Sequence, residues 1–133
     1  LERVGDHGLN IAKSARRLSK IGTFPELPEI EEMIERTRGM LSDALAAFVS
    51  RNSGTARMVV QQDDRVDNLR SSLFRILATH MLEDPRRIGP ALEYLLVSQN
   101  LERIADLCTN VAEEVVYLVE GKTIRHGGIP DPD

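Results

Sequence analysis

The chain has few of the residues on which many binding and catalytic sites depend. It contains one cysteine, three histidines, no tryptophan, two tyrosines and three phenylalanines among 133 residues. A single cysteine excludes an internal disulfide framework and a zinc site built on cysteines. The low aromatic content, beside abundant Leu, Ile, Val and Ala, favours a core of packed helices. No segment approaches eighteen uninterrupted apolar residues and no signal peptide is present, so we expect a soluble, cytoplasmic protein.

The chain also lacks an excess of basic residues. It has 17 Lys and Arg against 21 Asp and Glu, which gives a formal net charge of −4. Nucleic acid as the main partner would require a basic face, so the composition argues against it. Apolar residues make up 41 %, enough to exclude a disordered chain. The length gives room for one domain with a core of its own, or for one module and a piece of another.

Four segments show apolar residues at steps of three and four, which indicates helices. Gly22 and Gly121 stand where left-handed helix stops are expected, and Pro28 can begin a helix at its first turn. No strand pattern is present, so the sequence predicts an all-α fold, an antiparallel up-down helical bundle with short loops. The predicted helices span residues 1–21, 28–51, 55–82 and 85–120, and residues 122–133 should form a mobile tail.

One motif occurs twice, a hundred residues apart. LERVGDHGLNIAK at residues 1–13 and LERIADLCTNVAE at residues 101–113 share six identical residues. In both copies the shared Glu, Asp and Asn stand four residues apart, which places them on one stripe of a helix. The two stripes are Glu2, Asp6 and Asn10, and Glu102, Asp106 and Asn110. The chain is therefore interpreted as part of a duplicated helical protein with a candidate binding stripe.

Three acidic pairs share the four-residue spacing: Glu2/Asp6, Asp63/Asp67 and Glu102/Asp106. Side chains at this spacing on a helix have β-carbons about 5–6 Å apart, so two carboxylates can share one cation. Oxygen ligands favour iron, manganese, magnesium or calcium over a thiolate-type zinc site, and zinc stays open. The alternative is an ordinary charged helix face, because the stripe of the second copy lies off the apolar seam of its helix.

No Ser/His/Asp or Cys/His pairing has a spacing suited to catalysis, so the sequence indicates that the protein is not an enzyme. Cys108 falls on an apolar seam and is expected to be an inert, buried thiol. His80 lies near a predicted helix end, where packing or capping is expected rather than ligand binding.

The order of segments resembles the PhoU family of phosphate-transport regulatory proteins. The resemblance rests on the runs LERVGDHGLNIAK, FVSRNSGTARMVVQQDDRVDNL and MLEDPRRIGPALEYLLVSQNLERIADLCTNVAEEVVYLVEG. That family has two three-helix repeats with acidic Glu/Asp-x-x-x-Asp motifs. The resemblance implies that residues 1–21 are the last helix of the first repeat, 22–27 a linker and 28–121 the complete second repeat, with about two earlier helices missing. Leu107 departs from the family, which usually has the histidine that His7 keeps.

The resemblance implies a negative regulator of phosphate uptake and of the phosphate-starvation response. Such a protein couples the ATPase of a phosphate ABC transporter to a sensor histidine kinase and reaches the membrane only through its partners. Family members bind metal ions at the acidic motifs. A shared patch is therefore expected from Asp63, Asp67, Glu102 and Asp106, with Glu2 and Asp6 as half of a second patch.

Two other functions stay open at this point. One is a metal-storage or metalloenzyme bundle that uses the same carboxylates, and the other is a purely structural dimerisation module. We also expect the chain to form homo-oligomers, because the apolar seam of residues 1–21 needs cover from water.

Overall fold

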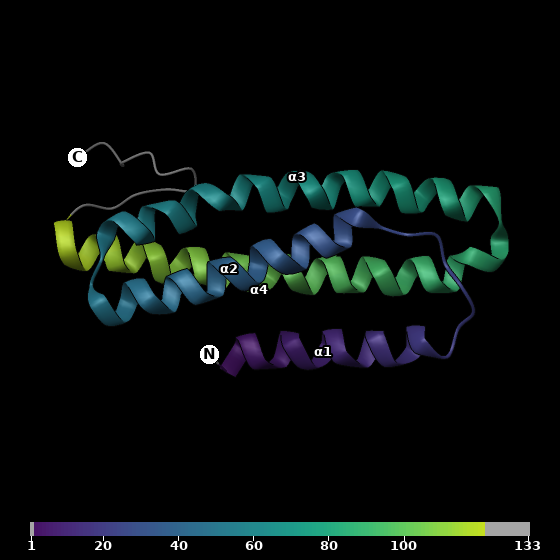
Figure 1. The fold of residues 1–133 in the computed structure, drawn as a ribbon, viewed down its shortest axis with the longest axis horizontal. Coiled ribbons are helices and arrows are strands. Elements are labelled where there is room, and N and C mark those ends of the chain that lie inside the picture. The colour runs from purple at the N-terminus through teal and green to yellow at the C-terminus, as the bar shows by residue number, and fades with distance from the viewer. Residues whose placement is uncertain (1, 122–133) are drawn as a thin grey trace.

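The computed structural model describes residues 2–121, which form an antiparallel bundle of long helices (Figure 1). The helices are α1 (Glu2–Ser19), α2 (Pro28–Ser50), α3 (Ser53–Glu83) and α4 (Ile88–Glu120), with a 3-10 turn η1 (Pro85–Arg87) before α4. No strand occurs within this part of the chain, so the predicted all-α fold is confirmed. The mobile tail predicted for residues 122–133 lies outside the described residues.

The turn between α2 and α3 is set by local sequence. Arg51 ends α2 in the left-handed region at φ 53° and donates its backbone N–H to the Ala47 carbonyl. Asn52 then caps α3, because its side chain accepts from the Thr55 backbone N–H at 3.1 Å. Only two residues separate the helices, one fewer than the turn of residues 52–54 read from the sequence, so α2 and α3 must run antiparallel.

The two glycines predicted as helix stops behave differently. Gly121 ends α4 at φ 69°, as expected for a glycine stop. Gly22 does not adopt a positive φ, so that prediction is wrong. Helix α1 ends at Ser19, and its last carbonyls are satisfied by tighter i→i+3 bonds from Lys20 to Arg17 and from Ile21 to Leu18.

Helices α2, α3 and α4 share one apolar core, and α1 packs on α4 (Figure 1). The largest fully buried apolar side chains of this core are Met33, Met40, Val59, Val60, Val66, Leu73, Leu77 and Val116. Val4 and Ile11 of α1 pack against its edge, whereas Leu9 on the outer side of α1 is 55 % exposed. Packing on α4 therefore covers part of the α1 seam, and the expected self-association stays a prediction.

Ion pairs connect three of the packed pairs of helices, α1 with α4, α3 with α4, and α2 with α3. Arg17 of α1 donates to Glu93 of α4 at 2.6 Å, and Arg57 of α3 donates to Glu120 of α4 at 2.7 Å. Between α2 and α3, Glu32 accepts from both Arg65 and Arg36, which lowers the pKa of Glu32 to about 2. These pairs are partly solvent-exposed, so apolar burial rather than charge pairing supplies most of the stability.

Two leucines of α3 provide a matched test of this core. Leu77 is fully buried and Leu82, five residues later, is 88 % exposed. We expect Leu77→Ala to lower the free energy of unfolding by about 2–5 kcal/mol because it leaves a cavity. Leu82→Ala should change it by less than about 0.5 kcal/mol. Urea unfolding followed by circular dichroism measures both values, and equal losses would contradict this placement of the core.

Candidate functional site on helices α3 and α4

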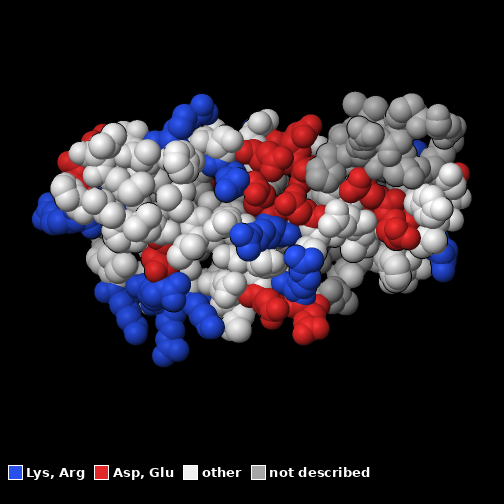
Figure 2. Space-filling model, turned by 180° about the vertical axis from the view of Figure 1, so that it is seen from behind, with Lys and Arg blue, Asp and Glu red and all other residues white. Residues whose placement is uncertain are grey.

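Three of the predicted carboxylates come together where α3 and α4 run side by side. Glu102 lies on α4 and accepts a hydrogen bond from Nη1 of Arg70 on α3 at 3.0 Å. Burial raises the pKa of Glu102, Arg70 opposes the rise, and the carboxylates of Asp67 and Asp106 add to it. The structure therefore brings Asp67, Glu102 and Asp106 within electrostatic reach of one another. Figure 2 shows Asp and Glu side chains gathered in the middle of the molecule's rear side.

Asp63 does not lie on the surface with the other three. Its residue is 2 % exposed, and Val59 and Val66, one helical turn away on either side, are buried as well. The sequence contains this signal, because steps of four and three place Asp63 on the apolar seam of α3. The prediction of a surface patch is therefore wrong for Asp63.

The arrangement does not assemble the predicted four-carboxylate metal patch. Within residues 2–121, no three Asp, Glu, His or Cys side chains are grouped so that they could hold a metal ion. Glu102 is engaged by Arg70, and Asp63 is turned into the core. The side chains as they stand thus do not fit a bound metal, and metal binding by Asp67, Glu102 and Asp106 stays a prediction.

The first copy of the motif is used for helix packing. Nδ1 of His7 donates to Oδ1 of Asn100 at 3.0 Å, and Nδ2 of Asn10 donates to the same oxygen at 3.3 Å. Asn100 in turn donates to the Leu96 carbonyl at 2.8 Å. Glu2 and Asp6 remain on the exposed side of α1. The role of Asn100 was missed because it lies just before the second motif and belongs to no pattern.

Two predictions about single residues are confirmed. Cys108 is 2 % exposed, and burial raises the pKa of its thiol to about 11, so it is unreactive at neutral pH. His80 packs edge-on against Phe24 with ring centroids 5.2 Å apart. It also accepts a hydrogen bond from Nη1 of Arg87 at 3.0 Å, which gives His80 a structural role at the end of α3.

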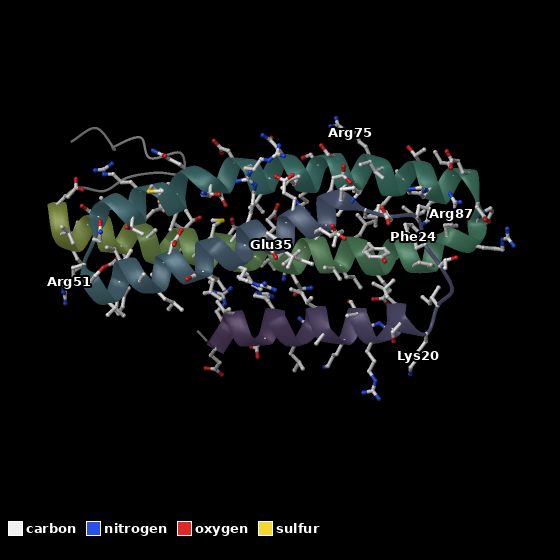
Figure 3. All side chains as sticks on the ribbon, viewed as in Figure 1. Lys20, Phe24, Glu35, Arg51, Arg75 and Arg87 are labelled. Carbon is white, nitrogen blue, oxygen red and sulfur yellow. The ribbon has the colours of Figure 1, made fainter. Side chains whose placement is uncertain are left out.

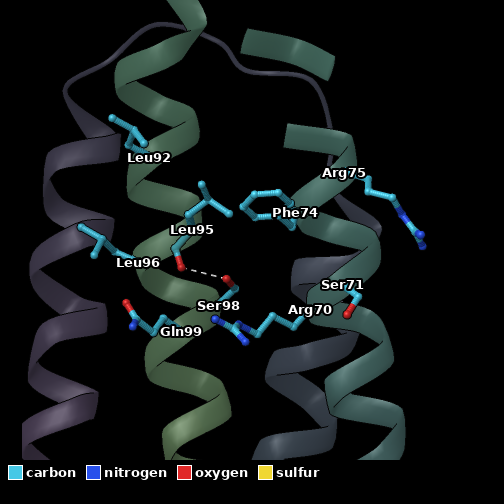
Figure 4. Close-up of a pocket in the computed structure, with 9 residues that line it drawn as sticks. All are labelled: Arg70, Ser71, Phe74, Arg75, Leu92, Leu95, Leu96, Ser98 and Gln99. Carbon is cyan, nitrogen blue, oxygen red and sulfur yellow. Dashed lines mark hydrogen bonds between the residues drawn. The ribbon is translucent and has the colours of Figure 1, made fainter. Parts of the chain in front are cut away.

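An apolar groove lies beside the acidic cluster and was not predicted. It has a volume of about 710 Å³ and runs between α3 and α4 (Figure 4). Its lining residues are Arg70, Ser71, Phe74, Arg75, Leu92, Leu95, Leu96, Ser98 and Gln99. The spacing of Leu92, Leu96 and Gln99 gives α4 a second stripe away from its core seam, and this was the available signal in the sequence.

The raised pKa of Glu102 predicts how the stability of the fold depends on pH. A carboxyl group with a raised pKa stabilises the fold fully below its unfolded pKa, and this contribution is lost as pH rises through the folded pKa. Asp67→Asn removes one repelling charge, so it should lower the pKa of Glu102 and improve stability at pH 7 relative to pH 4. Carboxyl NMR titration of Glu102 measures the shift, with Asp64→Asn as the control. An unchanged titration in Asp67→Asn would show that the two carboxylates are not neighbours.

Comparison with known proteins gives matches to one family over most of the chain. The PhoU domain model matches residues 30–115. The PhoU homologue of Clostridium acetobutylicum, a phosphate-specific transport system accessory protein, is 39 % identical over 93 % of this chain and 57 % of its own length. The homologue of Pseudomonas putida is 38 % identical over 97 % of this chain and 51 % of its own length. The chain thus spans about half the length of the curated relatives it matches.

Solved structures agree with the sequence comparison. The crystal structure of PhoU from Pseudomonas aeruginosa superposes with a TM-score of 0.87 at 36 % identity, covering 90 % of this chain and 58 % of that one. The phosphate transport system regulatory protein PhoU from Streptococcus pneumoniae gives a TM-score of 0.78 at 28 % identity, covering 92 % and 58 %. The motifs, the helical arrangement and these matches lead to one conclusion: the chain belongs to the PhoU family.

Proposed function

We propose that this chain acts in a PhoU-type regulator that restrains phosphate uptake and represses the phosphate-starvation response. The observation that supports this most is the match to PhoU from Pseudomonas aeruginosa over nearly the whole described bundle, at a TM-score of 0.87. Relatives are named accessory proteins of a phosphate-specific transport system, and one solved relative is named a regulatory protein. Both names point to an accessory or regulatory role in phosphate transport.

The proposed partners are the ATPase of a phosphate ABC transporter and a sensor histidine kinase. No helix within residues 2–121 is long and apolar enough to cross a membrane. In this proposal the protein works from the cytoplasm and reaches the membrane through its partners alone. Its role is to bind and couple them, with no reaction of its own.

A reporter assay tests the regulatory role. The chain is expressed in a bacterial strain that lacks its own PhoU protein and carries a reporter under a phosphate-starvation promoter. At high phosphate, we expect severalfold lower reporter output than with the empty vector. Val66→Pro is the control, because proline inside α3 breaks the helix and should abolish the effect. Reporter output at the vector level, with the chain soluble and helical, would contradict the proposal, and separate pull-downs with each partner test the coupling.

We also propose a second, metal-binding role for the acidic cluster, one that requires its side chains to rearrange from the positions described above. Asp67 and Asp106 both raise the pKa of Glu102, so three carboxylates already share one electrostatic environment. A divalent or trivalent cation would relieve their repulsion if Arg70 released Glu102. Glu2 and Asp6 lie exposed on α1 and would bind more weakly or not at all.

Titration calorimetry with iron, manganese, zinc, magnesium and calcium tests this role. We expect heat from the wild-type protein and little from the double variant Glu102→Gln, Asp106→Asn. Glu114→Gln, on an exposed part of the same helix, is the control and should bind as the wild type does. Equal heats for the wild-type protein and the double variant would show that the stripe is an ordinary charged helix face.

A further inference from the structure

The groove between α3 and α4 exposes large apolar side chains that the fold does not use. Phe74 is 59 % exposed, Leu92 is 50 % exposed and Leu96 is 43 % exposed. In Figure 4, Phe74 and Leu95 point toward each other across the groove, and Leu92 and Leu96 point toward α1. Together they form one elongated apolar strip along α4, with α1 on one side and α3 on the other. Contiguous apolar patches on a protein surface commonly mark interaction sites.

Cations border this strip on both sides. On the α3 side stand Arg70 and Arg75, which line the groove. On the α1 side, residues 7–25 contain no Asp or Glu and include Lys13, Arg16, Arg17 and Lys20, all of them exposed. Arg75 and Lys20 project from opposite edges of the molecule (Figure 3). Figure 2 shows Lys and Arg side chains at the lower left, where the C-terminal half of α1 lies, below a broad region with few charges.

The cations of the α1 border are mostly available to a partner. Arg17 is paired with Glu93, but Lys13, Arg16 and Lys20 form no ion pair with any residue in the range 2–121. Glu93 and Glu102 are the acids nearest the strip in sequence, and each forms an ion pair with an arginine. The N–O distance is 2.6 Å for Glu93 and 3.0 Å for Glu102. Away from the acidic cluster at its Arg70 end, the border of the groove is thus net positive, although the whole chain carries a net charge of −4.

The shape and charge of the groove select one kind of occupant. A second copy of the chain docked here by a two-fold axis would place two cationic borders against each other, which is repulsive. A flat lipid surface would contact the cationic edges before it reached Leu95 and Phe74 in the groove. Phosphate alone would leave the apolar lining uncovered. An amphipathic helix satisfies both features, because its apolar face fills the groove and acidic flanks meet the cations.

We propose that the α3–α4 groove docks an amphipathic helix with acidic flanks, supplied by a protein partner. The incoming helix lies along α4 between α1 and α3, with apolar residues at i, i+4 and i+7 against Phe74, Leu92 and Leu96. Acidic residues on its two flanks pair with Lys13 and Lys20 on one side and with Arg75 on the other, where the Arg75 side chain, which points away from the groove in Figure 4, turns toward the bound helix. The proposal concerns this surface alone and does not depend on phosphate regulation.

The probe is a synthetic, stapled helix of about four turns with Leu at i, i+4, i+7 and i+11 and Glu on both flanks. We expect it to bind the full chain in fluorescence anisotropy. Phe74→Ser and Leu96→Ser should each weaken binding about tenfold, as for truncation of a central anchor. Lys13→Glu combined with Lys20→Glu should weaken binding and reduce its salt dependence.

Matched controls come from exposed residues outside the groove. Phe48→Ser removes an aromatic side chain that is 56 % exposed on α2, and Arg38→Glu reverses an exposed charge on the same helix. Both variants should bind the probe as the wild type does. A peptide with Lys in place of Glu should bind at least tenfold more weakly. Equal binding by Phe74→Ser and Phe48→Ser, or equal binding of the two peptides, would overturn the proposal.

A footprint on the wild-type chain keeps the test valid if a variant misfolds. Hydrogen exchange with the probe bound should show added protection in residues 70–75 and 92–99. Protection elsewhere, or binding to anionic vesicles but not to the peptide, would overturn the proposal. A bound peptide together with an unrepressed phosphate reporter would refute only the regulatory role. A repressed reporter without peptide binding would refute only the groove.

Discussion

Burial of α4 along most of its length is the interaction on which the rest of the structure depends. Helix α4 packs against α1, α2 and α3, whereas α1 packs on α4 alone. Small residues such as Ala91, Ala105 and Ala112 are fully buried on α4, and they allow the neighbouring helices to approach closely. Because every other helix packs on α4, the geometry of both the acidic cluster and the apolar groove depends on it.

The duplicated motif shows how environment changes the chemistry of one sequence. In the second copy, Ala105, Cys108 and Ala112 are buried, while Gly5, Gly8 and Ala12 at the equivalent positions of the first copy are exposed. Helix α1 instead packs through His7, Asn10 and Ser14, on a different side. The acidic residues of the two copies also differ in their burial. Glu102 is partly desolvated beside α3 and has a raised pKa, whereas Glu2 and Asp6 stay in water.

The acidic cluster and the groove are distinct surfaces that share one side chain. Arg70 lines the groove and also donates to Glu102. One surface is acidic and is expected to attract cations, while the other is apolar with a basic border and suits an acidic helix. Two adjacent surfaces along the α3–α4 pair therefore differ in chemistry.

The sequence by itself determined the features that depend on one or two helical turns. The apolar period predicted the helices, and Pro28 and Gly121 marked two of their ends because start and stop signals act on neighbouring backbone groups. The local signal failed at Gly22, where i→i+3 bonds closed the helix end without a left-handed residue. The family resemblance rested on motif order and was also readable without a structure.

Only the tertiary structure decided how the helices are rotated toward one another. That rotation turned Asp63 into the core, set Asn100 against His7, and brought Asp67 of α3 close to Glu102 and Asp106 of α4. It also placed Phe74 beside Leu95 to form the groove. A period of three and four residues defines the apolar face of each helix only to within one residue on either side. Contacts at the edges of those faces, where both candidate sites lie, therefore depend on how all the helices pack together.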